Sequence, residues 1–243
     1  LSRRRQAEGT EDFRMILGAV LSLLGLLIGF SLSMSISGFN SRQMGEEAEA
    51  AAIHAAYIRA DLLPAEDRGR MRSLLAGYLE KRLQFYSTPD AQERERIHGE
   101  TLGIQNQLWS TVSAVANARQ TPIIALTITG ISDVLNAEKN IQSSWRNQIP
   151  VAAWMLLGLI ALCCNTMVGY NLRSARRKAG LLLVLPAMIS MSFLMIADID
   201  VPGAGLIRVK PLNLDYLQQT IMERQAMLPA AGHPRAGAPA AGN

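Results

Sequence analysis

Two aspartates directly follow the third uncharged stretch of the chain and are the residues best suited to chemistry. They are Asp198 and Asp200, and Arg208 and Lys210 lie just beyond a turn at Pro202–Gly205. Carboxylates at the C-terminal end of a helix oppose the helix dipole by a few tenths to about 1 kcal/mol each, so they need cationic partners. We expect a structural ion pair of Asp198 or Asp200 with Arg208 or Lys210. A cation site, or the charged vestibule of an ion path, is the alternative.

Small residues form a stripe along the first uncharged stretch. They are Gly18, Ser22, Gly25, Gly29 and Ser33, at spacings of four, three, four and four residues. Residues with this spacing lie on one face of a helix, and small side chains there let another helix approach closely. We expect this stripe to be a helix-packing seam, and a pore lining is the alternative.

Asn165 lies deep within the second uncharged stretch. A polar side chain inside a membrane needs a partner within the protein. We expect a single interhelical hydrogen bond from Asn165, and a place along an ion path is the alternative.

Tyr78, Arg82 and Tyr86 are four residues apart, so they share one helix face and the guanidinium can lie between the two rings. A preceding helical segment offers charged residues that could pair with them, namely Arg59, Asp61 and Glu49. We expect these residues to belong to the core of a helical domain rather than to a ligand site.

The sequence contains no pattern typical of a catalytic, cofactor or metal site. His54, His98 and His233 are far apart, and Cys163 and Cys164 are adjacent. No HExxH helix, P-loop, GxSxG turn or complete dinucleotide fingerprint occurs. We therefore predict a protein that is not an enzyme, with no catalytic residues, no metal site and no cofactor. The net charge of +4 is too small and too dispersed to indicate a nucleic-acid partner.

Charge is unevenly distributed along the chain that must position these residues. Only 18% of residues are charged, against about 25% in an ordinary globular protein. Residues 15–41, 147–172 and 179–197 carry no charge, whereas the other segments have the charge density of solvated protein. The composition indicates a protein that is part membrane and part water-exposed, and it excludes a soluble single-core enzyme and a disulfide-rich scaffold.

Each uncharged stretch is long enough to cross a bilayer as a helix, which takes roughly 20 residues. The predicted transmembrane helices are 15–37, 149–170 and 180–197. A basic N-terminal segment, 1–14, precedes the first helix, and a basic loop, 171–179, joins the second to the third. The chain begins with Leu rather than Met, so a fourth span missing from the N-terminus is an open alternative.

The segment 38–148 is predicted to be an extramembrane helical domain. Its helices stop or start at Pro64, Pro89 and Pro122. Apolar residues recur between the prolines at spacings of three and four, which predicts about four helices in an antiparallel bundle that could continue into the spans. After the third span we expect a turn and a short helix in 198–228, then a disordered Ala/Gly/Pro tail in 229–243. The predicted fold class is all-α.

Basic residues near the span ends predict the orientation of the chain. They gather before the first span and between the second and third spans, as Arg3, Arg4, Arg5, Arg14, Arg173, Arg176, Arg177 and Lys178. The positive-inside rule places both clusters in the cytoplasm and the 38–148 domain outside the membrane. We predict a multi-pass protein in the lipid bilayer of the bacterial inner membrane.

Several motifs resemble the bacterial bestrophin-like family, whose members carry a domain of unknown function. The shared segments, in chain order, are GFSLSMSISGFNSRQ, EAAAIHAAYIRADLLP, YLEKRLQFY, NQIPVAAWMLL, MVGYNLRSARR and DIDVPGAGLIRV. The sequence departs from the family pattern at Ala51, where Asn is expected, and at Val201, where a basic residue is usual.

The resemblance implies a small multi-span membrane protein, and members usually have a further span before a short basic loop. Bestrophins proper are pentameric chloride channels with a large cytosolic helical region, a topology opposite to the one that the basic residues predict. The resemblance therefore implies a homo-oligomer and a small anion as the candidate ligand.

Two functions follow as hypotheses. The first is an oligomeric membrane protein that conducts or regulates small anions, which the resemblance and the Gly/Ser stripe favour. The alternative is a non-conducting membrane sensor or scaffold whose helical domain binds a partner. The size of the charged domain and its lack of chemical groups favour this alternative.

Overall fold

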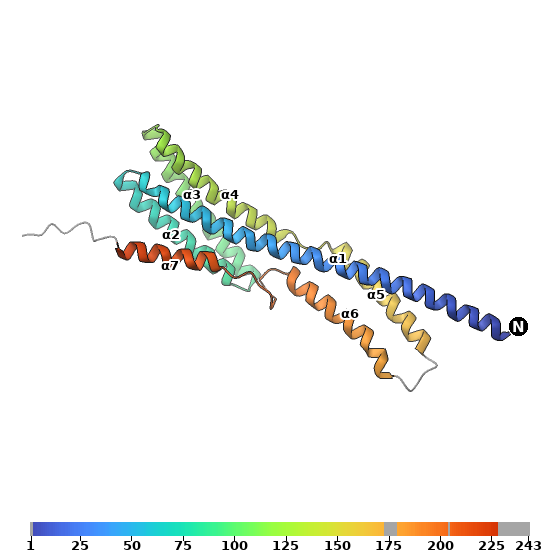
Figure 1. Cartoon of the computed structure of the whole chain (residues 1–243). Coiled ribbons are helices and arrows are strands. Elements are labelled where there is room, and N and C mark those ends of the chain that lie inside the picture. The colour runs from blue at the N-terminus through green and yellow to red at the C-terminus, as the bar shows by residue number, and fades with distance from the viewer. Residues whose placement is uncertain (1, 173–178, 204, 228–243) are drawn as a thin grey trace, which may run out of the picture.

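The structure of this 243-residue chain is a computed structural model that describes residues 2–172, 179–203 and 205–227 (Figure 1). These residues form seven α-helices and one short 3-10 helix, and no strand occurs among them. Three helical segments are long and apolar enough to cross a membrane. The predicted fold class, an all-α multi-span membrane protein, is confirmed.

Helix α1 (Ser2–Arg59) runs without a break from the N-terminal segment, through the first predicted span, into the domain. Its 58 residues make it about 87 Å long at about 1.5 Å per residue. The segment contains no proline, so nothing in the backbone forces the helix to end at the predicted boundary between 37 and 38. One continuous helix therefore belongs to both the membrane part and the domain.

The remaining helices of the domain begin where local signals place them. They are η1 (Ala60–Leu62), α2 (Ala65–Ser87), α3 (Ala91–Ala118) and α4 (Pro122–Arg146). Asp90 caps α3 by accepting a hydrogen bond from the Gln92 amide, and Thr121 caps α4 in the same way, with Pro122 in its first turn. Such caps satisfy backbone N–H groups that have no partner within the helix.

The domain packs around one apolar core. The second half of α1 lies beside α2 and α4, α3 completes the bundle, and α7 (Leu212–Met227) covers α1 and α2 (Figure 1). Glu46 of α1 holds the start of α7, because its carboxylate accepts hydrogen bonds from the Asn213 and Leu214 amides at 2.9 Å each. Fully buried core residues include Ile53, Tyr57, Met71, Leu75, Leu108, Ile131 and Leu214.

Helices α5 (Val151–Leu172) and α6 (Ala179–Asp200) lie beside the N-terminal half of α1 (Figure 1). A non-helical link at 147–150, which includes Pro150, separates α4 from α5, so the domain continues into the membrane part without a break only through α1. The start of α1, the end of α5 and the start of α6 gather at the end of the molecule far from the domain (Figure 1). Most of the predicted basic loop and the whole predicted tail lie outside the described residues.

Candidate functional site

The five small residues of the predicted seam are all exposed along one face of α1. They are Gly18, Ser22, Gly25, Gly29 and Ser33. A Cβ atom added at Gly18, Gly25 or Gly29 would meet nothing within 4 Å. The seam therefore has no packing partner among the described residues of its own chain.

The other side of α1 makes the contacts with α5 and α6. Leu24 packs in an apolar cluster with Ala161, Cys164 and Ile189. Ser35 is also buried there, and its hydroxyl lies 3.5 Å from the Ile196 carbonyl oxygen of α6. The three membrane helices thus use one face of α1 for packing within the chain and leave the Gly/Ser face open.

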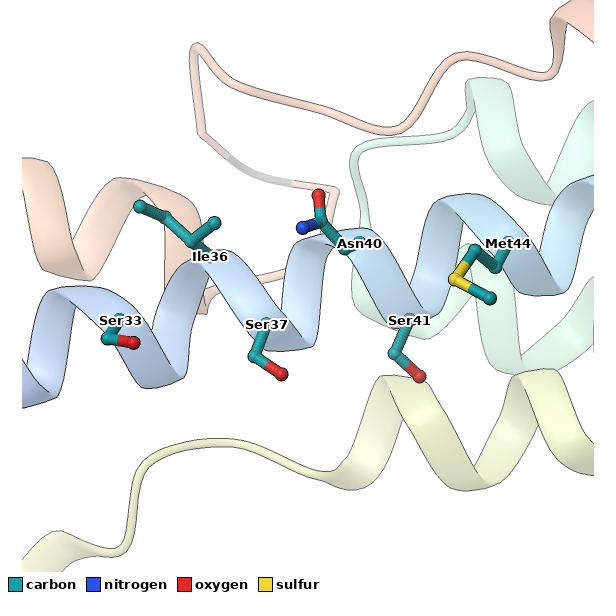
Figure 2. Close-up of a pocket in the computed structure, with 6 residues that line it drawn as sticks. All are labelled: Ser33, Ile36, Ser37, Asn40, Ser41 and Met44. Atoms are coloured by element: carbon teal, nitrogen blue, oxygen red, sulfur yellow. The ribbon is translucent and has the colours of Figure 1, made fainter.

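Toward the domain, the open face becomes a shallow polar depression of about 460 Å³. Figure 2 shows Ser33, Ser37 and Ser41 along one edge of α1 and Ile36, Asn40 and Met44 along the adjoining edge. We call the five small residues together with Ser37, Asn40 and Ser41 the α1 polar face. It offers hydroxyl and amide groups, and no charged group, to whatever lies against it.

Asp198 does not pair with Arg208 or Lys210, which corrects the expectation from sequence. Its two carboxylate oxygens accept hydrogen bonds from the backbone amides of Leu206 and Ile207 at 2.7 and 2.9 Å. Backbone N–H groups of the following loop thus take the place of a cation. A Cβ atom at Gly205 would collide with the Asp198 carbonyl oxygen, so this loop requires a glycine there.

Asp200 likewise makes no ion pair with Arg208, and it is held by the link between α4 and α5. Its oxygens accept hydrogen bonds from the Ile149 amide at 3.1 and 3.3 Å. Arg42 of α1 is 2% exposed and donates from Nη2 to the Ile199 carbonyl oxygen at 2.8 Å, next to Asp200. Arg42 is therefore the cation at the C-terminal end of α6. It lies 158 positions before Asp200, so no local spacing in the sequence relates the two residues.

A pocket of about 290 Å³ lies at the same junction, where α1, the 147–150 link and the end of α6 meet. Polar residues from all three segments line it, including Ser37, Ser41, Asn147, Gln148 and Asp200. Two of these serines belong to the α1 polar face. The junction of membrane part and domain is thus open and polar on the side of that face.

Asn165 finds no hydrogen-bond partner for its buried Oδ1 atom among the described residues. The expected interhelical hydrogen bond within the chain is therefore not seen.

The Tyr78, Arg82 and Tyr86 side chains lie buried in the domain and surround a single carboxylate, that of Glu49. Arg82 donates to it from Nε and Nη2, and the two tyrosine hydroxyls donate at 3.1 and 3.4 Å. The guanidinium lies over the rings of Phe85 and Tyr86, 4.5 and 5.6 Å from their centroids, rather than between the two tyrosines.

The other two charged residues that the sequence offered to this cluster lie elsewhere. Arg59 is 3.5 Å from Asp133 at the surface, and Asp61 pairs with Arg72 and Arg224. A second buried carboxylate, that of Glu138 of α4, also belongs to the cluster. No pattern in the sequence predicted that Glu138 lies there.

Burial and charge together perturb the ionisable groups of this cluster. Burial raises the pKa of Glu49, and the charge and hydrogen bonds of Arg82 oppose that rise. Burial by itself would lower the pKa of Arg82, but the neighbouring Glu49 carboxylate raises it. Burial, reinforced by the Glu49 charge, raises the pKa of both tyrosines. The cluster therefore holds a charged Arg82 and two neutral phenols.

Within residues 2–172, 179–203 and 205–227, no three His, Cys, Asp or Glu side chains come together in a way that could hold a metal ion. The polar groups where the membrane part meets the domain are hydroxyls, amides, two carboxylates bonded to backbone amides, and the buried Arg42 guanidinium. This arrangement can contact ions or a second helix.

Fold and site together define a helical membrane protein in which one long helix carries an open polar face from the membrane into a helical domain. A bestrophin-like domain model matches residues 1–214, and the chain belongs to the bestrophin-like family. The resemblance found in the sequence motifs is confirmed.

Solved structures share this fold. Two crystal structures of a bacterial bestrophin homolog from Klebsiella pneumoniae, one of them a point mutant, each have a TM-score of 0.69 and 13% identity, with 88% of both chains covered. A further crystal structure, described as that of a membrane protein, has a TM-score of 0.69 at 12% identity over 88% of both chains. At this identity the likeness concerns the fold alone. The comparison with curated proteins finds no match.

Proposed function

We propose that this chain assembles into an oligomeric membrane channel for small anions, with the α1 polar face lining the path. The observation that carries the proposal is that this face, from Gly18 to Ser41, is exposed although α5 and α6 already cover the other side of α1. Membership of the bestrophin-like family supports the same function.

An oligomer is part of the proposal because one helix cannot enclose a path. Copies arranged around a symmetry axis can each contribute the same helix and close a ring. The glycines of the α1 polar face would let these helices approach closely near the membrane end, and the hydroxyls of Ser33, Ser37 and Ser41 would face the lumen further along.

An anion is favoured by the chemistry of the face. Residues 15–41 carry no charge, so no carboxylate repels an anion within the membrane part of α1. Hydroxyl and side-chain amide groups donate hydrogen bonds, which can replace part of the hydration shell of a halide. Basic residues at the start of α1, Arg3 to Arg5 and Arg14, would raise anion concentration at that mouth.

Planar-bilayer recording of the purified full chain tests the proposal. In a KCl gradient we expect a current whose reversal potential has the sign of the chloride equilibrium potential rather than that of potassium. Ser37→Leu should lower the conductance tenfold or more, because it replaces a lumen hydroxyl by a larger apolar group, whereas Leu23→Ile on an exposed apolar position should leave it unchanged. No current from protein shown to be folded and oligomeric would overturn the proposal.

A second candidate function is a non-conducting sensor or scaffold, and the surface of α3 favours it. Residues 101–118 of this helix carry no charge, and Leu102 and Trp109 are 43% and 45% exposed. An exposed apolar patch on an extramembrane domain is typical of a protein contact. Under this alternative, Trp109→Ala would abolish cross-linking to a partner, and the wild-type protein would carry no current.

A further inference from the structure

The buried cluster around Arg82 contains two carboxylates and one guanidinium. Glu49, Glu138 and Arg82 are all buried, with exposures of 0%, 4% and 0%. Arg82 gives two of its nitrogens to Glu49, and its third, Nη1, lies 3.8 Å from Glu138 Oε1 without making a hydrogen bond. Arg82 therefore hydrogen-bonds to Glu49 and pairs with Glu138 only through a longer contact without a hydrogen bond.

His98 of α3 lies directly against this second carboxylate. Its Nδ1 atom is 3.0 Å from Glu138 Oε1, and Gln142 Nε2 lies 3.0 Å from the same oxygen. Gln142 Nε2 also lies 3.1 Å from Nδ1, so Nδ1 accepts a hydrogen bond from this amide when it carries no proton, and a protonated Nδ1 donates to the Glu138 carboxylate instead. The His98 side chain is 15% exposed, so its imidazole can exchange protons with water.

We propose that His98 and Glu138 form a proton-binding site that couples pH to the packing of α3 against α4. Uptake of a proton by the imidazole places a cation beside Glu138 and brings the buried cluster from one net negative charge to neutrality. Because α4 packs along α1 and α1 continues into the membrane, the site links pH to the spanning helix.

Other charged and titratable groups around the pair have partners of their own. From α1 and α2, Glu138 faces Glu49, Arg82 and Tyr78. Tyr86 lies next to these groups, where the charges of Glu49, Arg82 and Glu46 act on it. On α3, Arg94 donates to the Thr88 and Pro89 carbonyls and lies over the Trp145 ring of α4. At the exposed edge of α2 and α3 the ionic groups pair with one another, namely Lys81, Glu93, Arg96 and Glu100. Glu138 is thus the carboxylate of this group that lies against an imidazole rather than a hydrogen-bonded cation.

Thermal unfolding of the full chain in detergent micelles, with a tag that contains no histidine, tests the site. From about pH 8 to about pH 5.5 the wild-type midpoint should rise relative to His98→Gln by roughly 2–4 °C, because only the wild type gains the ion pair. Glu138→Gln should remove the same gain with His98 intact. His54→Gln is the matched control, because His54 is exposed on α1, and it should follow the wild type.

A pH profile that is parallel in wild type and His98→Gln, or that changes in His54→Gln instead, would overturn the proposal. If a variant fails to fold, the wild-type imidazole resonances provide the measurement. His98 must then titrate over this range in step with the unfolding midpoint, and a constant His98 resonance would contradict the site.

An effect of pH on conductance through His98 rests in addition on the proposed channel function. The absence of any current with the unfolding result intact would therefore count against the channel alone.

Discussion

Glu49 is the residue around which the polar core of the domain is organised. Four donors from Arg82, Tyr78 and Tyr86 of α2 reach its carboxylate, which belongs to α1. Removing a carboxylate from water costs several kcal/mol, so a buried one is stable only with such partners. The same contacts join α1 to α2, and they therefore tie the helix that enters the membrane to the bundle.

Substitution of Glu49 by Ala should destabilise the folded domain by about 3–5 kcal/mol, because Arg82 would stay buried without its partner. Chemical unfolding of the purified chain measures the change. Glu93→Ala is the control, since Glu93 pairs with the exposed Arg96, and it should leave the transition unchanged. Equal effects of the two substitutions would contradict the central role of Glu49.

The two buried phenols predict a loss of stability at alkaline pH. Burial and the Glu49 charge raise the pKa of both Tyr78 and Tyr86 in the folded chain. Phenols of the unfolded chain lose their protons near about pH 10, so above that pH the folded state binds more protons and its stability falls as pH rises.

Tyr86→Phe should flatten this alkaline fall, because the phenylalanine ring has no proton to lose. Unfolding transitions between about pH 9 and about pH 11 measure the slope. Tyr216→Phe removes a phenol that is 73% exposed and should keep the wild-type slope. If stability falls with pH at the same slope in the wild type and both variants, the buried Tyr86 phenol is not the cause of the fall.

At the scale of elements, the contact between α1 and α4 holds the domain together and depends on glycines. A Cβ atom at Gly45 would lie 3.2 Å from an Ile141 side-chain carbon, and one at Gly130 would lie 3.1 Å from the Arg59 side chain and 3.5 Å from the Ala56 Cα. The distances of 3.1 and 3.2 Å to side-chain carbons are shorter than the usual contact of about 3.5–4.0 Å between carbon atoms. The two helices can therefore lie this close only with small residues at these points.

Gly130→Leu should push α4 away from α1 and destabilise the domain by about 1–3 kcal/mol, the usual effect of overpacking. Gly99→Leu on α3 is the matched control, because Gly99 is exposed and a Cβ atom added there meets nothing within 4 Å, and it should be neutral or slightly stabilising. Hydrogen exchange of α4 amides measures the loss of protection at the contact between α1 and α4. Equal protection in the two variants would contradict the requirement for a small residue at Gly130.

At the scale of the whole molecule, α1 has one covered and one open side along its membrane half. α5 and α6 cover the first, and the α1 polar face stays open. A polar face exposed to lipid leaves hydroxyl and amide groups without partners, which is unfavourable in a bilayer. Contact between copies, or a water-filled path between them, removes that cost.

Gly25→Leu should therefore leave the fold of one chain intact and disrupt its assembly, because Gly25 is exposed and a Cβ atom added there meets nothing within 4 Å in its own chain. Light scattering of the detergent-solubilised protein measures the mass of the complex. Gly25→Ala should have a smaller effect, and Gly158→Leu on α5 tests whether the effect belongs to α1. An unchanged oligomer in Gly25→Leu would exclude the α1 polar face from the interface.

The orientation of the whole molecule is predicted by its basic residues. The start of α1, the end of α5 and the start of α6 lie at one end of the molecule (Figure 1), and we therefore expect both basic clusters on one side of the membrane. With Cys163 and Cys164 replaced by Ser, Glu100→Cys should react with an impermeant reagent in intact cells. Reaction only after lysis would place the domain in the cytoplasm, as the family resemblance implies.

The membrane helices and the helix starts of the domain could be predicted from sequence, because they depend on residues close together in the chain. An uncharged run is apolar wherever it lies, and Thr121 with Pro122 starts a helix through its own backbone geometry. The four-residue spacing of Tyr78, Arg82 and Tyr86 likewise places them on one face of any helix that contains them.

Only the tertiary structure decided the partners of the polar side chains. Asp198 takes backbone amides instead of Arg208, Arg42 reaches the end of α6, and His98 meets Glu138. The tertiary structure also shows that α1 runs unbroken into the domain and that its Gly/Ser face is open instead of packed against α5 or α6. Local sequence determines which faces a helix carries. Which faces meet depends on the packing of all the helices together, and that packing joins residues far apart in the chain.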